Sequence, residues 1–154
     1  MKADEIRAEN ARLDEALLEE AQGFNPTRLT LAPEGEWSAA QVMAHLSEFP
    51  RFFAGELGRW RDDPSAVIGR TVEHPVRLAA VESPAKVLGA LVAGMHSAFT
   101  ELAAELEKLR DDDIEAKTEN VKYGTEPLSA FFDRYVIGHK AGHLDQLRAL
   151  AAEP

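Results

Sequence analysis

Two histidines stand four residues apart near the C-terminal end of the chain, in the sequence GHKAGHLDQL, as His139 and His143. Residues at positions i and i+4 of a helix lie on the same face, so two imidazoles at this spacing can point at one ion. A third histidine, His45, lies far upstream on a similar apolar pattern. If its helix packs beside the helix of the pair, the three imidazoles can bind one face of a single ion. The chemistry that this spacing predicts is the binding of a divalent metal ion.

The histidine pair alone also fits two core or surface side chains with ordinary hydrogen bonds. Gly138 and Gly142 precede the two histidines, and glycine inside a helix costs about 1 kcal/mol relative to alanine, which suggests a close approach of another backbone there. Three imidazoles that share an ion also satisfy one another's polar nitrogens. Lys140 excludes the HExxH motif of zincins, and the chain lacks the ExxH steps of carboxylate-bridged di-iron bundles.

The composition predicts one globular domain. With 154 residues, 45% of them hydrophobic, the chain can fold as one domain, residues 1–154, around one core. The net charge of −10 should repel nucleic acid and anionic membranes. The start, MKADEIRAEN, lacks the apolar stretch of a secretory signal, and no apolar run approaches the roughly 20 residues of a membrane span. We therefore expect a cytoplasmic protein without nucleic-acid or membrane partners.

Four helical patterns cover most of the chain, and no segment shows the period-two alternation of a strand. The first pattern runs from about residue 3 to residue 22 and ends at Gly23. The segment 61–82 has no sustained periodicity and predicts a long connection, while the third helix begins at Ser83. We expect Asp111–Asp113 in the loop that follows this helix, because their charges are unfavourable at a helix C-terminus.

The second and fourth helices carry the histidines. Ser38 and Gln41 predict a capping box at the start of the second helix, where His45 points inward with the apolar residues. Pro50 predicts a kink beside His45. Trp37 should pack on the first turns of this helix. The fourth helix opens near Thr125 and Pro127 and carries the histidine pair. The predicted fold class is all-α, a four-helix bundle with a long crossover connection.

Two segments resemble a known family. The sequence WSAAQVMAHL, in which His45 follows Trp37 by eight residues, and the closing YGTEPLSAFFDRYVIGHKAGHLDQL resemble the DinB/YfiT-like family of metal-binding four-helix bundles. The resemblance spans essentially the whole chain and is most specific in the patterns WSxxxxxxH and HxxxHxxQ. It implies a divalent ion, zinc or nickel with iron as a further option, held by His45, His139 and His143. It also implies reactions that use low-molecular-weight thiols such as bacillithiol or mycothiol, and a homodimer.

Three neutral imidazoles leave an ion with an open face, which catalytic sites use and structural sites do not. A thiol bound there favours its nucleophilic thiolate, which makes a metal-dependent thiol S-transferase the leading hypothesis. The thiol must come from outside, since the chain has no cysteine. Water bound there predicts a metal-dependent hydrolase instead. A catalytically silent module that binds a metal or a small ligand is the alternative from a different class.

Four further side chains have candidate roles. Glu48, one turn after the first histidine of the trio, can act as a general base or as an acceptor that orients a ligand, or it can simply be solvated or paired. Gln146, three residues after the last histidine, can orient a ligand or cap a neighbouring helix. His96 is expected to pack its ring at the boundary of the third helix, and His74 is expected to be exposed in the crossover.

Overall fold

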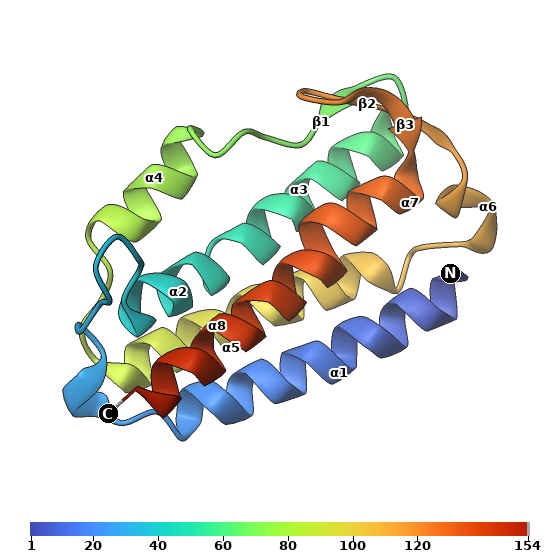
Figure 1. Ribbon diagram of the computed structural model, residues 1–154. Helices are drawn as coiled ribbons and strands as arrows, with labels where there is room; N and C mark the ends of the chain where they lie inside the picture. Colours follow the sequence, from blue (N-terminus) through green and yellow to red (C-terminus); the bar gives the residue numbers. More distant parts are fainter. Residues whose placement is uncertain (154) are drawn as a thin grey trace.

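Four helical rods lie side by side in the computed structural model, which describes residues 1–153 (Figure 1). The expected domain of residues 1–154 ends on a residue outside this range. The helices and strands are α1 (Ala3–Gln22), η1 (Pro26–Arg28), α2 (Ala39–Leu46), α3 (Phe49–Asp62), β1 (Val67–Ile68), α4 (Pro75–Glu82), α5 (Leu88–Leu106), α6 (Asp111–Ile114), β2 (Lys117–Asn120), β3 (Gly124–Pro127), α7 (Leu128–Phe131), η2 (Phe132–Ile137) and α8 (Gly138–Ala152). The rods are α1, then α2 with α3, then α5, and finally α7, η2 and α8 in succession.

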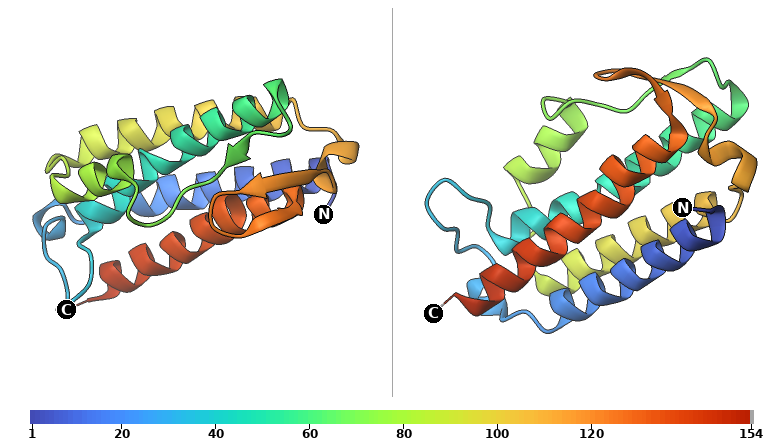
Figure 2. Two further views of the ribbon diagram at one scale, coloured as in Figure 1. Left: turned by 90° about the horizontal axis from the view of Figure 1, so that it is seen from above. Right: turned by 45° about the vertical axis from the view of Figure 1, so that its right-hand side comes forward.

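The packing of these rods is that of a four-helix bundle with a crossover. α1 packs against α5 and α8, and α3 packs against α5. Figure 1 shows α1 and the α8 rod running in one direction and the α3 and α5 rods in the other, so the chain between α3 and α5 runs back along the bundle. This is the expected long crossover, and α4, which lies in it, packs against α2. The two termini lie at opposite ends of the bundle in both views of Figure 2.

The apolar stripes of the rods face a common core, as the sequence patterns predicted. α1 has the predicted bounds and buries Ile6, Leu13 and Leu17, each at most 1% exposed. Within residues 1–153, no helix combines the length and apolar character of a membrane span.

The second rod is interrupted beside His45. The capping box is confirmed: Ser38 Oγ accepts from Gln41 N at 3.2 Å, and Gln41 Oε1 accepts from Ser38 N at 2.9 Å. α2 ends at Leu46, and α3 restarts at Phe49 with Pro50 in its first turn, where proline costs no helical hydrogen bond. The kink predicted from Pro50 is therefore a full break between two helices. Glu48 lies in this break, next to the end of α2.

A small sheet adds to the expected helices. β1 pairs in parallel with β2, and β2 pairs antiparallel with β3. Thr125 and Pro127 belong to β3, not to the start of the fourth helix, which begins at Leu128. Strands of two to four residues are too short to show an alternation in the sequence. The sheet contacts α3 through β1 and α7 through β3, so it connects these two rods at one end.

Three sequence-based boundaries were wrong. Residues 75–82 form α4, and the third long helix, α5, starts at Leu88 after a further connection, not at Ser83. Asp111–Asp113 do not lie in a loop but form the first turn of α6, where negative charge is favourable. The side chain of Asp111 also accepts a hydrogen bond from Ala3 N at 2.9 Å and so ties α6 to the start of α1.

The fourth rod contains a π-helical segment directly before the histidine pair. In η2 the backbone hydrogen bonds span five residues instead of four, and Gly138 N donates to Asp133 O at its end. A Cβ atom on Gly138 would lie 2.4 Å from that oxygen, whereas one on Gly142 would meet nothing within 4 Å. Of the two glycines expected to allow a close approach, only Gly138 does so. The group that approaches is the backbone of its own helix.

Candidate metal centre

The three histidines singled out in the sequence meet in the interior. His45 comes from the last turn of α2, and His139 and His143 come from the first turns of α8. Their ring centroids are 4.8–5.0 Å apart. One nitrogen from each ring lies within 4.8 Å of the others, and the Nε2 atoms of His45 and His139 are 3.0 Å apart. Such a cluster can hold a metal ion.

The imidazoles are neutral at physiological pH, which is the form that binds metals. Burial lowers the pKa of His45, which is 1% exposed. Burial, together with the neighbouring histidines, lowers the pKa of His139 to about 2. Burial and the His45 ring likewise lower the pKa of His143 to about 4. Neutral rings carry a free lone pair on one nitrogen each, so the cluster offers three donors.

Two polar side chains face the outer nitrogens of these rings. Gln146 Oε1 lies 2.9 Å from His143 Nδ1, and Glu48 Oε2 lies 3.4 Å from His45 Nδ1. Both are acceptors, so they favour a proton on Nδ1 and leave the Nε2 lone pairs free. The Nδ1 atoms of His45 and His139 are both buried without a hydrogen bond of ordinary geometry among residues 1–153, so Glu48 approaches His45 as a polar contact.

Glu48 is held in place by a buried arginine that the sequence did not single out. Arg70 Nη2 donates to Glu48 Oε2 at 2.8 Å, and Nη1 contacts Oε1. The Arg70 guanidinium also lies 4.4 Å from the centroid of the Phe52 ring. Although burial opposes it, the contact with His45 and the hydrogen bonds from Arg70 lower the pKa of Glu48. Arg70 lies in the crossover, where no periodicity or motif marked it.

Aromatic rings pack against the histidine cluster. The Phe49 ring stacks on His139 with centroids 3.9 Å apart, and Trp37 stacks on His143 at 6.2 Å. Trp37 also meets His45 edge-on at 5.3 Å. Its expected packing on the second helix therefore includes a histidine of the cluster, and it reaches α8 as well.

Lys140, next to His139 on α8, fixes the rotation of this helix. Its side chain is fully buried and points into the bundle, where Nζ donates to Asn10 Oδ1 at 2.6 Å and contacts Asp14 on α1. Because successive helical residues point in different directions, anchoring Lys140 toward α1 turns His139 and His143 toward α2.

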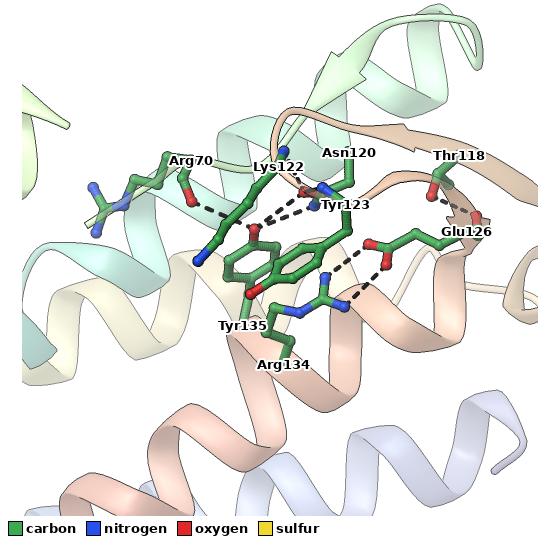
Figure 3. A network of polar contacts seen from close by, with 8 residues as sticks. All are labelled: Arg70, Thr118, Asn120, Lys122, Tyr123, Glu126, Arg134 and Tyr135. Carbon is green, nitrogen blue, oxygen red and sulfur yellow. Dashed lines mark hydrogen bonds and ion pairs between the residues drawn. The ribbon is translucent and has the colours of Figure 1, made fainter. Parts of the chain in front are cut away.

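Two adjoining cavities border the cluster at His139. The larger has a volume of about 210 Å³ and is lined by His139, Tyr135, residues 70–72, Lys122, Tyr123 and Arg134. The smaller, of about 110 Å³, shares its walls at residues 70–72, Tyr135 and His139. Figure 3 shows the polar network beside them, in which the Tyr135 hydroxyl lies 3.2 Å from Asn120 Nδ2 and 3.4 Å from the Arg70 carbonyl oxygen.

The other two histidines lie outside the cluster, and both expectations about them were wrong. His96 is exposed on α5 and does not pack its ring at a boundary. His74 is half-buried, with its ring 4.9 Å from the Phe52 ring, and its Nδ1 accepts from Val76 N to cap α4.

The amino-acid sequence matches no protein-family model and no curated protein. The fold, in contrast, matches solved structures over nearly the whole chain. The colibactin self-resistance protein ClbS, crystallised in complex with double-stranded DNA, superposes with a TM-score of 0.77 at 11% identity, covering 98% of this chain and 96% of ClbS. An uncharacterized protein from Clostridium difficile 630 has a TM-score of 0.74 at 10% identity, covering 97% and 95% of the two chains. A Streptococcus pneumoniae protein has a TM-score of 0.74 at 11% identity, covering 97% and 90%.

These similarities confirm the expected helical-bundle fold. At 10–11% identity they show the fold alone. The presence of DNA in the ClbS crystal is a property of ClbS, and the expectation that this chain binds no nucleic acid stays a prediction.

Proposed function

We propose that this chain is a metal-dependent enzyme of the DinB/YfiT-like family that holds a divalent ion, zinc or nickel, with His45, His139 and His143. The observation that carries the proposal is the convergence of three neutral imidazoles on one point from two helices. Bonds of 2.0–2.1 Å in a tetrahedral zinc site separate nitrogen ligands by about 3.3 Å. The 3.0 Å between the Nε2 atoms of His45 and His139 is close to this value.

The donor set fits a catalytic ion better than a structural one. Within residues 1–153, no cysteine, aspartate, glutamate or further histidine joins the three histidines in this cluster, which leaves a position for a small ligand. When bound, such an ion acts as a Lewis acid that lowers the pKa of a thiol or a water molecule beside it. We propose that an external low-molecular-weight thiol is the nucleophile and a small electrophile its acceptor. The family resemblance and the absence of cysteine from the chain support this choice.

Glu48 and Gln146 act in this proposal as positioning residues. Each holds the Nδ1 side of one histidine, and so each fixes the ring orientation and the tautomer. Arg70 keeps Glu48 ionised and in place. A general-base role for Glu48 is the alternative, in which its carboxylate would take the proton of the incoming thiol. Phe49 and Trp37 exclude water from two sides of the cluster.

Metal analysis tests the ligand set. The purified protein is loaded with zinc or nickel, freed of excess ion without chelators, and analysed for bound metal. The wild type should hold one equivalent per chain, and the His139→Ala variant much less than one. His96→Ala is the matched control, because His96 is exposed and outside the cluster. Full metal content in the His139→Ala protein would count against ligation.

Activity separates the enzyme from a silent binding module. The metal-loaded protein is incubated with bacillithiol or mycothiol and the electrophile monochlorobimane, with the metal-free protein as control. A faster rate with metal supports the S-transferase, and hydrolysis of an activated ester without thiol supports the hydrolase. Equal rates with and without metal favour the silent module. The homodimer that the resemblance implies is tested by light scattering on the same samples.

A further inference from the structure

The cavities beside His139 are lined by positive charge in a chain whose net charge is −10. Arg70 lines both cavities, Lys122 and Arg134 line the larger, and Arg77 lines the smaller. No aspartate or glutamate lines either one. A protein this acidic repels small anions from most of its surface, so a local reversal of sign marks the place where an anion would gather.

Two of the four cations are already neutralised. Arg70 forms its ion pair with Glu48, and Arg134 forms two hydrogen bonds with Glu126, at 2.8 and 2.9 Å. Figure 3 shows the Arg134 pair below the β2–β3 hairpin. These pairs hold the cavity walls in shape and contribute little net charge to the space between them.

The other two cations have no carboxylate partner among residues 1–153. Arg77 donates to the Val72 carbonyl oxygen at 2.8 Å and lies over the Trp37 ring at 5.2 Å. Lys122 Nζ lies 5.2 Å from the centroid of the Tyr123 ring, and no dashed contact reaches this nitrogen in Figure 3. Burial and the nearby charge of Arg70 lower the pKa of Arg77, while the charge of Glu48 opposes this shift, so an anion beside Arg77 would stabilise its positive charge.

We propose that the substrate or cosubstrate is a small oxyanion whose carboxylate or phosphate groups bind Lys122 in the larger cavity and Arg77 in the smaller cavity beside His139. A guanidinium and an ammonium are the donors that proteins use for such groups. The role as substrate rests on the proposed function, whereas binding of the anion does not.

The size and position of the cavities fit this ligand class. The larger cavity of about 210 Å³ corresponds to roughly seven water molecules at ~30 Å³ each, enough for a small acid. His139 is one of the residues that line both cavities. An anion held by Arg77 and Lys122 would therefore lie against one of the three candidate metal ligands, which is where a reacting group must be.

The test is anion binding to the metal-free full-length protein at constant ionic strength. Inorganic phosphate, succinate and the neutral analogue succinamide are titrated while the NMR signals of the Trp37 indole N–H and the Lys122 amide are followed. Phosphate or succinate should give saturable shifts, and succinamide none. Arg77→Gln and Lys122→Gln should each weaken binding by about five- to tenfold, as expected for the loss of one charge-assisted hydrogen bond.

Lys117→Gln is the matched control, because Lys117 is exposed on β2 and does not line the cavities. An equal loss of binding in this variant, or the absence of saturation with both anions, would overturn the proposal. The stronger of the two anions identifies the group as a phosphate or a carboxylate. Zinc binding is measured on the same samples: zinc without anion binding refutes only this inference, and anion without zinc binding refutes only the metal-dependent function.

Discussion

The Nε2 atoms of His45 and His139 face each other at 3.0 Å although the residues are 94 positions apart in the chain. Glu48 is 3.4 Å from the other nitrogen of His45 and so favours a proton there. His45 Nε2 is then an acceptor, and only one of the two facing atoms can carry a proton. A metal ion between the rings would use both lone pairs. The proton on His45 and the contacts of Glu48 and α8 around these rings have measurable consequences.

Replacing Glu48 by glutamine should destabilise the protein strongly. The change leaves the Arg70 guanidinium, whose side chain is 3% exposed, without its counter-ion, and breaking a buried pair in this way costs about 3–5 kcal/mol. Glu101→Gln is the control, because it breaks the exposed pair with Arg51 and should cost no more than about 1 kcal/mol. Urea unfolding measures both. Equal losses would mean that the Glu48 pair has no special structural role.

The same Glu48→Gln protein separates positioning from base catalysis. A positioning residue should change zinc affinity, by about 10- to 100-fold, because partners of metal-bound histidines have effects of this size. A general base should instead leave zinc affinity unchanged and lower kcat. Zinc titration and steady-state kinetics on one preparation distinguish the two.

Acid should destabilise the metal-free protein through the buried histidines. The folded state holds the pKa of His143 at about 4, whereas an unfolded histidine titrates near 6.5. Between these values the unfolded chain binds more protons, so stability is complete above pH of about 6.5 and falls as the pH drops toward 4. Urea unfolding in EDTA at several pH values measures the slope. His143→Asn should reduce it, and a slope unchanged from the wild type would contradict the buried, neutral state of this ring.

The two glycines of α8 should respond oppositely to alanine. Gly138→Ala places a methyl group against the Asp133 carbonyl oxygen and should destabilise the protein and disturb the π-helical turn. Gly142→Ala has open space and should stabilise by up to about 1 kcal/mol. Thermal unfolding of the pair gives the two signs. A neutral Gly138→Ala substitution would show that the turn relaxes without cost.

Duplex DNA should not bind this chain at physiological salt. Non-specific DNA binding depends on neutralising phosphates with lysine and arginine, and a net charge of −10 opposes it. Fluorescence polarisation with a labelled duplex measures this, and ClbS, whose crystal structure includes double-stranded DNA, is the natural positive control. Saturable binding at about 150 mM salt would contradict the prediction.

The sequence predicted the features that depend on periodicity and spacing. The bounds of α1, the capping box at Ser38 and the inward face of His45 follow from local patterns and are confirmed. The meeting of His45 with the α8 pair needed one further assumption, that their helices are neighbours. The general lesson is that helix faces can be predicted from single segments.

The features that the sequence did not predict depend on partners far along the chain. Arg70 has no motif around it, and its role becomes visible only when the crossover folds back onto Glu48. Lys140 entered the sequence analysis only as the residue that excludes an HExxH motif, yet its side chain is buried against Asn10 on α1. The π-helical turn is marked in the sequence by one residue, Gly138, because a side chain there would clash with the Asp133 carbonyl oxygen. Tertiary contacts, and not local propensity, determined each of these.

X-ray absorption spectroscopy of the zinc-loaded protein counts the ligands of the ion. We expect three imidazole ligands with nitrogen atoms at about 2.0–2.1 Å, no sulfur, and one further light atom that exchanges for sulfur when a thiol is added. The imidazole count should fall to two in the His45→Ala protein. Fewer than three imidazoles in the wild type, or a fourth protein ligand that no thiol displaces, would contradict the proposed three-histidine site.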